Sequence, residues 1–317
     1  MARPHRIDTH HHILPPAYVA EERERILAVA GMVGPQFLDW SPQKAIEEMD
    51  RNGVATAIVS ISTPGVWFGD KEQGRRLARL CNEYGASMMR EHPGRFGMFA
   101  ALPLPDIEGS LREIEYALDT LKLDGVGLMT SYANKWPGDP AFAPVFDELD
   151  RRKTAVYFHP TMAVCCPSIP DLAPALIEFP TDTTRAITTL LFSGTFSRCP
   201  DLRFIFSHGG GTLPMLVSRM TGSLDRASMK HVKARIPKGA LYELRRQYYD
   251  TAGIANPVAI AALSKFAPMT QILFGSDFPF WPIAWIAEGL RGLELSVSDL
   301  QAIERDNALR LFPKYRG

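Results

Sequence analysis

Residues 6–12 read Arg-Ile-Asp-Thr-His-His-His, an apolar and β-branched start that runs into three consecutive histidines. Such a stretch is typical of a short β-strand that ends in polar side chains. Because successive side chains of a strand point to opposite faces, His10 and His12 should project together while His11 points away. Imidazole is the commonest metal ligand in proteins. The stretch therefore predicts an opening strand that supplies two ligands of a metal site.

Similar short runs, rich in β-branched and aromatic residues, recur along the chain between longer segments of helical periodicity. Eight of them lie near residues 6–12, 55–62, 96–103, 125–131, 155–159, 203–208, 247–252 and 271–277. Between them, residues 41–52 begin with a Ser-Pro cap and residues 71–90 carry an apolar stripe, so both are expected helices. Alternating strands and helices imply a parallel sheet, and eight repeats favour a closed barrel.

An open, doubly wound sheet is the competing topology. It would place a glycine-rich phosphate turn after the first strand, but residues 8–16 contain no glycine. The expected fold is therefore a (β/α)8 TIM barrel, built as one domain over residues 1–317. Longer connections at 13–40, 63–70, 132–139 and 160–181 should elaborate one face of the barrel as lid or pocket loops.

The composition points to a small-molecule partner. The chain has 35 Lys and Arg against 35 Asp and Glu, so no net charge attracts nucleic acid or an anionic membrane. We expect no membrane span, because no apolar run approaches the roughly 18 residues required. The start of the chain leads into no apolar signal region, and the spacing of the cysteines fits neither a zinc ribbon nor a disulfide framework. A cytoplasmic enzyme with reduced cysteines is expected.

Polar side chains stand at the carboxyl ends of many of the expected strands. They are His10 and His12, Ser60 and Ser62, Thr130, His159, His208, Asp250 and Asp277. In a parallel barrel these ends share one face, where active sites are built.

Two of these residues are candidates to complete the metal site. His159 ends the run Val-Tyr-Phe-His-Pro; a lone strand-end histidine is more often structural, but with two imidazoles already on the first strand a third ligand is favoured. Asp277 follows the eighth strand, where an Asp commonly caps a turn. A barrel places strand eight beside strand one, so Asp277 should reach the metal or its bound water.

His208 is followed by three glycines, Gly209 to Gly211. Glycine amides at a helix start can bind phosphate, but no lysine follows as in a P-loop. The simpler interpretation is that the glycines let the backbone pass close to a bound substrate. His208 would then act as an acid, a base or a ligand.

Together these segments resemble the amidohydrolase-related, metal-dependent decarboxylases, the family of 2-amino-3-carboxymuconate 6-semialdehyde decarboxylase. The likeness rests on residues 7–12, 158–160, 179–184, 207–211 and 275–280. A closer likeness to the 6-methylsalicylate decarboxylases is carried by residues 62–65, 81–84, 92–103 and 123–126.

The resemblance implies one divalent metal ion, zinc in the first place and manganese as the alternative. Its ligands would be His10, His12, His159 and Asp277, with His208 as the catalytic histidine. It also implies a homodimer or homotetramer. One departure concerns the substrate, because the muconate enzyme uses arginines to hold a substrate carboxylate. The region before Trp40 lacks the first of these arginines, and Arg226 lies only near the position expected for the second. A dicarboxylated muconate is therefore disfavoured.

The hypothesis that follows is non-oxidative decarboxylation of a small aromatic acid of the ortho-hydroxybenzoate type. The metal would bind the carboxylate and the neighbouring phenolic oxygen. Asp277 would deliver a proton with His208 exchanging it through water, although the opposite assignment is equally compatible. Loop aromatics suited to a flat ring, each of which can instead be a core anchor, are Phe280, Trp281, Trp67 and Phe68.

The main alternative is a mononuclear hydrolase of an amide, lactone or ester on the same barrel. Binuclear relatives carry a bridging carboxylated lysine at the end of strand four, whereas here Lys135 lies well into the following loop, so one metal is expected. A barrel with a purely structural metal is disfavoured, because structural zinc favours cysteine and four closed ligands.

Overall fold

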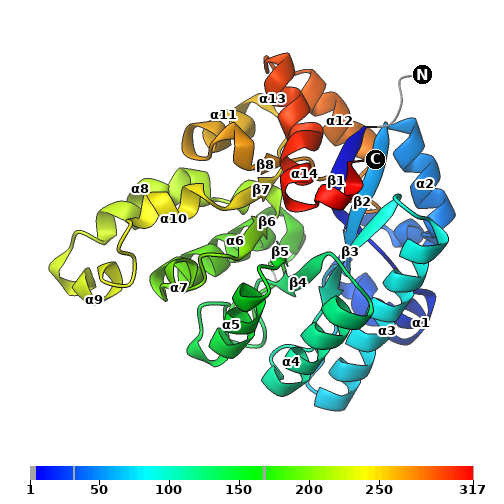
Figure 1. Ribbon diagram of the computed structural model, residues 1–317, viewed down its shortest axis with the longest axis horizontal. Coiled ribbons are helices and arrows are strands. Elements are labelled where there is room, and N and C mark those ends of the chain that lie inside the picture. The colour runs from blue at the N-terminus through cyan, green and yellow to red at the C-terminus, as the bar shows by residue number, and fades with distance from the viewer. Residues whose placement is uncertain (1–4, 31–32, 167–168, 317) are drawn as a thin grey trace.

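The computed structural model describes residues 5–30, 33–166 and 169–316. Its centre is an eight-stranded parallel sheet in the order β1 to β8, surrounded by helices (Figure 1). The strands are β1 (Arg6–His12), β2 (Val54–Ser60), β3 (Phe96–Ala101), β4 (Gly125–Met129), β5 (Ala155–His159), β6 (Arg203–Phe206), β7 (Tyr248–Asp250) and β8 (Ile272–Leu273). The eight predicted strands and the (β/α)8 barrel are confirmed. Several strands end earlier than predicted, because the chain leaves the sheet to form the rim.

Helices follow the strands around the outside of the barrel. They are α1 (Pro16–Ala30), α2 (Pro42–Arg51), α3 (Lys71–Glu91), α4 (Ile107–Glu115), α5 (Ala143–Arg151), α6 (Pro174–Phe192), α7 (Thr195–Arg198), α8 (Leu213–Ser223), α9 (Lys230–Lys233), α10 (Ala240–Arg245), α11 (Pro257–Phe266), α12 (Ile283–Arg291), α13 (Val297–Gln301) and α14 (Asn307–Leu311). The two predicted helices correspond to α2 and α3, and the Ser41 hydroxyl caps α2 by accepting from the Lys44 amide. Within the described residues, no helix has the length and apolar character of a bilayer span.

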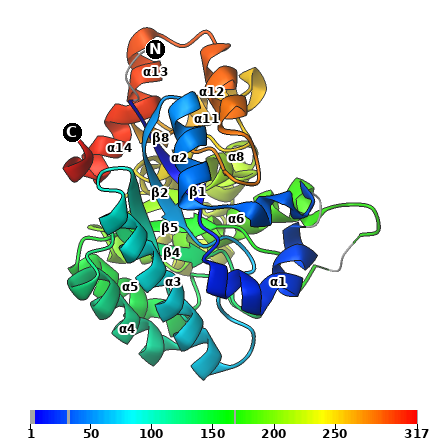
Figure 2. The same cartoon turned by 90° about the vertical axis from the view of Figure 1, so that its right-hand side faces the viewer.

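Two of the predicted loops contain helices. Residues 13–40 hold α1, and the connection after β5 becomes α6 at Pro174. The buried side chains of α1 are Tyr18, Glu22, Ile26 and Ala30. Their four-residue spacing is a helical stripe, but a charged residue within it weakens the apolar pattern. Figure 2 shows α1 and the connection between β5 and α6 projecting on the same side of the barrel.

The interior of the barrel is filled by side chains from alternate strand positions. Phe99 on β3 stacks on Tyr157 on β5, with ring centroids 5.2 Å apart. Phe312, just after α14, packs against Phe99 from below at 5.8 Å. The segment after α14 therefore packs against the interior of the barrel.

The ring of strands is closed by the segment that follows β8. The amide of Thr9 donates to Phe274 O at 2.9 Å, and the amide of His12 donates to Phe278 O at 2.8 Å. Between them, the amide of Asp277 donates to His10 O at 2.7 Å. These bonds continue the pairing of β1 past the two-residue β8, and they place Asp277 beside His10 and His12.

Asp8, on β1, stabilises this closure of the barrel through hydrogen bonds. Its fully buried carboxylate accepts from the Ser276 hydroxyl at 2.5 Å, from the Ser276 amide at 3.0 Å and from the His10 amide at 3.1 Å. The His11 ring contacts the same carboxylate at 3.1 Å and packs on Phe278 at 4.9 Å. His11 thus lies on the opposite face from His10 and His12, as predicted.

We predict that Ser276→Ala destabilises the barrel by about 1–3 kcal/mol, because it leaves part of a buried carboxylate without its hydroxyl donor. The measurement is the free energy of unfolding by chemical denaturation. Ser264→Ala, which removes a hydroxyl that bonds only within its own helix α11, is the matched control. Equal stability of the two variants would contradict the role assigned to Asp8.

Candidate metal centre

Four side chains from three places in the sequence meet at the carboxyl end of the barrel. His10 and His12 come from β1, His159 ends β5, and Asp277 follows β8. One ligand atom from each lies within 4.8 Å of every other, and all four residues are buried. The four residues predicted as ligands from the sequence are therefore brought together.

The outer nitrogens of two of these imidazoles are held by oxygens that can only accept. His10 Nδ1 lies 2.9 Å from Asp250 Oδ2, and His159 Nδ1 lies 2.9 Å from the Pro160 carbonyl. Each Nδ1 must therefore carry the proton. The Nε2 atoms point into the centre, and when the rings are neutral their lone pairs face it, which is the usual arrangement of metal-binding histidines.

The inner atoms lie at spacings that suit a single cation. His10 Nε2 and His12 Nε2 are 3.1 Å apart, and Asp277 Oδ1 is 3.1 Å from His12 Nε2 and 3.2 Å from His10 Nε2. Ligands about 2.1 Å from a tetrahedral zinc ion would be roughly 3.4 Å apart. Inward lone pairs this close repel one another unless a positive charge lies between them, so the donor set fits a metal ion.

The charges of the centre agree with this fit. Burial disfavours a proton on His10, but Asp250 and Asp277 outweigh it and raise the pKa of His10 to about 10. Burial, with His12 and His10 nearby, holds the pKa of His159 well below its ordinary value. Burial opposes ionisation of Asp277, yet His10 keeps the pKa of that carboxyl well below its ordinary range. The surrounding carboxylates thus favour a positive charge in the centre.

Asp250, at the end of β7, links two parts of the site. One carboxylate oxygen bonds His10 Nδ1, while the other accepts from the His208 amide at 2.9 Å and the Ala252 amide at 3.0 Å. From the sequence, Asp250 was a strand-end polar residue without a role. Its position on the same rim as the ligands was the available signal, but its partner could not be chosen without the register of β7.

His208 lies beside the four candidate ligands, with its Nε2 3.4 Å from Asp277 Oδ2. Its Nδ1 is buried and has no hydrogen-bond partner in the described part of the chain. His208 and Asp277 both adopt left-handed backbone conformations, with φ of 52° and 65°. Such conformations are uncommon outside glycine and gather at functional sites.

The glycines after His208 serve packing within the protein. A Cβ on Gly211 would lie 2.0 Å from the Pro180 carbonyl oxygen on α6, and one on Gly210 would lie 2.9 Å from the Tyr249 ring on β7. These contacts with α6 and β7 explain why glycine is needed at the two positions. That the glycines also let the backbone pass close to a substrate stays a prediction.

The residues predicted to contact substrate are dispersed. Phe280 lies next to the centre, with its ring 5.5 Å from that of His12. Trp281 packs against Trp285, with ring centroids 4.6 Å apart and the ring planes tilted by 45°. Among these aromatics, the observed geometry thus favours Phe280 as a neighbour of the substrate.

The other three residues predicted to contact substrate have different surroundings. The Phe68 ring is covered by the Arg25 guanidinium at 4.4 Å, and the Trp67 ring lies over Gly74 of α3. Arg226 is exposed in the connection between α8 and α9. Their roles toward a substrate stay predictions.

Lys135 lies outside the centre. It is exposed, and its ammonium group is 3.4 Å from Asp139 in its own loop. This position agrees with the expectation of one metal ion rather than two.

Comparisons with known proteins place the chain in a family. Residues 7–314 match the family model described as amidohydrolase. The chain belongs to the amidohydrolase family. It is 38% identical over 330 residues to the decarboxylase yanB of Aspergillus niger, covering 98% of this chain and 88% of that one. It is 35% identical over 321 residues to the 6-methylsalicylic acid decarboxylase of Penicillium expansum, covering 98% and 97%.

Solved structures of other proteins share the fold. An amidohydrolase II with 28% sequence identity superposes with a TM-score of 0.88 over 97% of this chain and 99% of that one. The 5-carboxyvanillate decarboxylase of Sphingomonas paucimobilis, at 22% identity, gives a TM-score of 0.86 over 98% and 99%. The family resemblance predicted from the sequence motifs is confirmed.

We predict that Asp250→Asn weakens metal affinity about 10–100-fold, because His10 loses the carboxylate that fixes its tautomer and orientation. The measurement is competition with a chelator at fixed pH. Asp147→Asn, which changes an exposed carboxylate on α5 paired with Arg198, is the matched control and should bind metal like the wild type. Unchanged affinity in Asp250→Asn would contradict the orienting role.

Proposed function

We propose that this protein is a metal-dependent decarboxylase that removes carbon dioxide from a small aromatic acid of the ortho-hydroxybenzoate type. The observation that carries the proposal is the cluster of His10, His12, His159 and Asp277, with His208 beside it. This cluster lies in a chain that is 35–38% identical, over 98% of its length, to proteins named decarboxylases. Among them are two named for 6-methylsalicylic acid.

In this proposal His10, His12, His159 and Asp277 hold one divalent ion. When bound, that ion supplies a Lewis acid that fixes the acid's oxygens and draws electron density from the ring. The buried surroundings exclude water and strengthen the electrostatic interactions of these side chains. Phe280, beside His12, provides an apolar ring surface next to the reacting carbon.

The reaction exchanges a carboxylate for a proton at one ring carbon. The bond between that carbon and the carboxyl carbon breaks, its electron pair stays with the ring and takes up a proton, and carbon dioxide leaves without oxidation or reduction. His208 Nε2 and Asp277 Oδ2, which are 3.4 Å apart, form a pair able to hold and pass this proton. Asp277 then handles the proton at the ring, with His208 exchanging it with solvent, or the two roles are reversed.

We propose zinc as the native ion, because three imidazoles and one carboxylate suit it, with manganese as the alternative. Metal analysis of protein purified without added ions tests this choice. Reconstitution of chelator-treated protein with each ion separately is the second arm. Activity restored by manganese and not by zinc would reverse the assignment.

Product analysis tests the reaction class. We expect carbon dioxide and a phenol from hydroxybenzoates, and, in D2O, one deuterium at the carbon that carried the carboxylate. Mass spectrometry and NMR of the product report both. A ring-opened or hydrolysed acid without gas release would instead assign the protein to the hydrolases.

We predict that His208→Asn lowers kcat about 10²–10⁴-fold, the range expected for loss of a proton-transferring group. Its metal content should be unchanged, because His208 is outside the set of four ligands. His231→Asn, an exposed histidine on α9, is the matched control and should keep wild-type kcat. Full activity of His208→Asn with normal metal content would refute its catalytic role.

We also propose that the protein forms a homodimer or homotetramer. Large apolar side chains stand exposed near the rim and on the adjacent connection, among them Val164, Ile169, Leu176, Met215 and Trp285. Surface of this kind favours association between copies. Light scattering of the purified protein tests the proposal, and a monomer at micromolar concentration would contradict it.

A further inference from the structure

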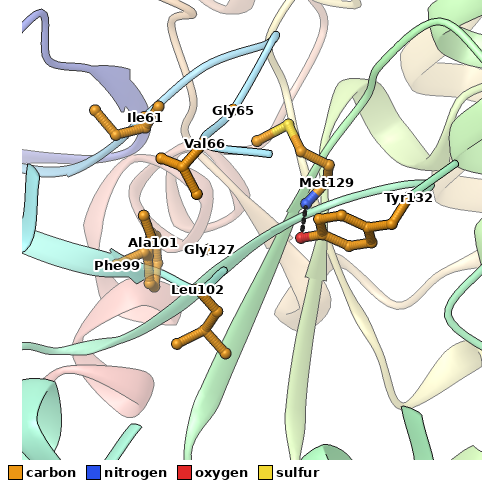
Figure 3. A pocket seen from close by; sticks show the side chains of 9 residues that line it. All are labelled: Ile61, Gly65, Val66, Phe99, Ala101, Leu102, Gly127, Met129 and Tyr132. Carbon is orange, nitrogen blue, oxygen red and sulfur yellow. Dashed lines mark hydrogen bonds between the residues drawn. The ribbon is translucent and has the colours of Figure 1, made fainter. Parts of the chain in front are cut away.

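A small apolar cavity opens at the rim between β2, β3 and β4 (Figure 3). Its walls include Ile61, Val66, Ala101, Leu102 and Met129. The volume of the cavity is about 20 Å³. A space of this size holds one water molecule or one methyl group.

The cavity adjoins the candidate metal centre through shared neighbours. Ile61 directly follows Ser60, whose hydroxyl is 3.2 Å from His12 Nδ1. Met129, on the cavity wall, pairs in the sheet with the candidate ligand His159. A ring held at the metal centre would therefore have the cavity at its edge.

The cavity exists because two positions on its floor carry almost no side chain. Gly127 pairs with Tyr157, whose ring fills the barrel interior 5.3 Å from that of His10. Because neighbouring residues in register point to the same face, a side chain at Gly127 would point inward as well. Ala101, at the end of β3, contributes only a methyl group. Larger residues at these two positions would occupy the space.

We propose that this cavity is a subsite for a methyl-sized apolar substituent on the aromatic acid, and that Gly127 determines whether such a substrate is accepted. The inference rests on the proposed function. Among the lining residues Tyr132 alone carries a hydroxyl, and that oxygen accepts from the Met129 amide at 2.9 Å. A methyl group loses no hydrogen bonds on entering such a space, whereas a polar substituent loses its hydrogen bonds with water.

Gly127→Ala tests the proposal with little disturbance of the barrel. Its Cβ would lie 3.4 Å from Phe99 Cβ and 3.6 Å from Ser60 Cβ, which is ordinary contact. The substrates are 2-hydroxybenzoate and its four ring-methyl isomers. We expect wild-type kcat/KM to favour one methyl isomer over 2-hydroxybenzoate by at least tenfold, a typical effect of filling an apolar pocket. Gly127→Ala should abolish that preference while changing kcat/KM for 2-hydroxybenzoate by less than threefold.

Three further variants complete the design. Ala101→Val narrows the same cavity from β3 and should abolish the preference for the methyl isomer, as Gly127→Ala does. With two variants, the test can still be made if one of them folds poorly. Ala261→Val, exposed on α11, is the matched control for the added bulk and should keep the wild-type preference. Tyr132→Phe should leave the preference for the methyl isomer intact. A selective loss of activity on 2,6-dihydroxybenzoate in Tyr132→Phe, with no methyl preference in the wild type, would show a polar subsite instead.

Binding measurements separate this inference from the proposed function. Calorimetric titration gives Kd for 2-hydroxybenzoate and for each methyl isomer with the metal-loaded protein. If none of these acids is turned over, the proposed function fails. A gain in binding from the methyl group that Gly127→Ala removes would still support the subsite. Equal binding of all the acids by the wild type, or an equal loss for all of them in Gly127→Ala, would overturn it.

Discussion

The candidate site depends on how the barrel is closed. Regular pairing of β8 extends over Ile272–Leu273, and the ring is completed by the irregular segment that follows. The buried carboxylate of Asp8 holds this segment through the amide and hydroxyl of Ser276. Because Asp277 is the next residue, the contact that closes the barrel also places the fourth candidate ligand beside His10 and His12. Stability and metal binding therefore share one structural origin.

A second constraint comes from Asp250. Its two oxygens hold the His10 side chain and the His208 backbone, so β7 sets the distance between a ligand and the neighbouring histidine. The same carboxylate, together with Asp277, outweighs burial and raises the pKa of His10. The centre is thus built from residues on β1, β5 and β7 and at the rim after β6 and β8, each contributing one or two groups.

Much of this arrangement could be predicted from the sequence, because parallel strands leave their carboxyl ends on one face. His10, His12 and His159 lie in the carboxyl-terminal parts of their strands and Asp277 follows β8, so the barrel topology brings them together. The role of Asp250 could not be predicted, because a strand-end carboxylate is equally suited to capping a turn. The contacts of loop aromatics such as Phe68 could not be predicted either, because they depend on which side chains the neighbouring helices present. Here the Phe68 ring lies under the guanidinium of Arg25 on α1.

The candidate ligands and Asp250 lie on β1, β5 and β7 and after β8, whereas the small cavity lies between β2 and β4. Gly127 and Ala101 can therefore change without touching His10, Asp250 or Asp277. In evolutionary terms, the two halves of the rim are free to vary at different rates. Single substitutions at the strands around the cavity can change the substrate while the candidate metal ligands stay fixed. Protein engineering can follow the same route.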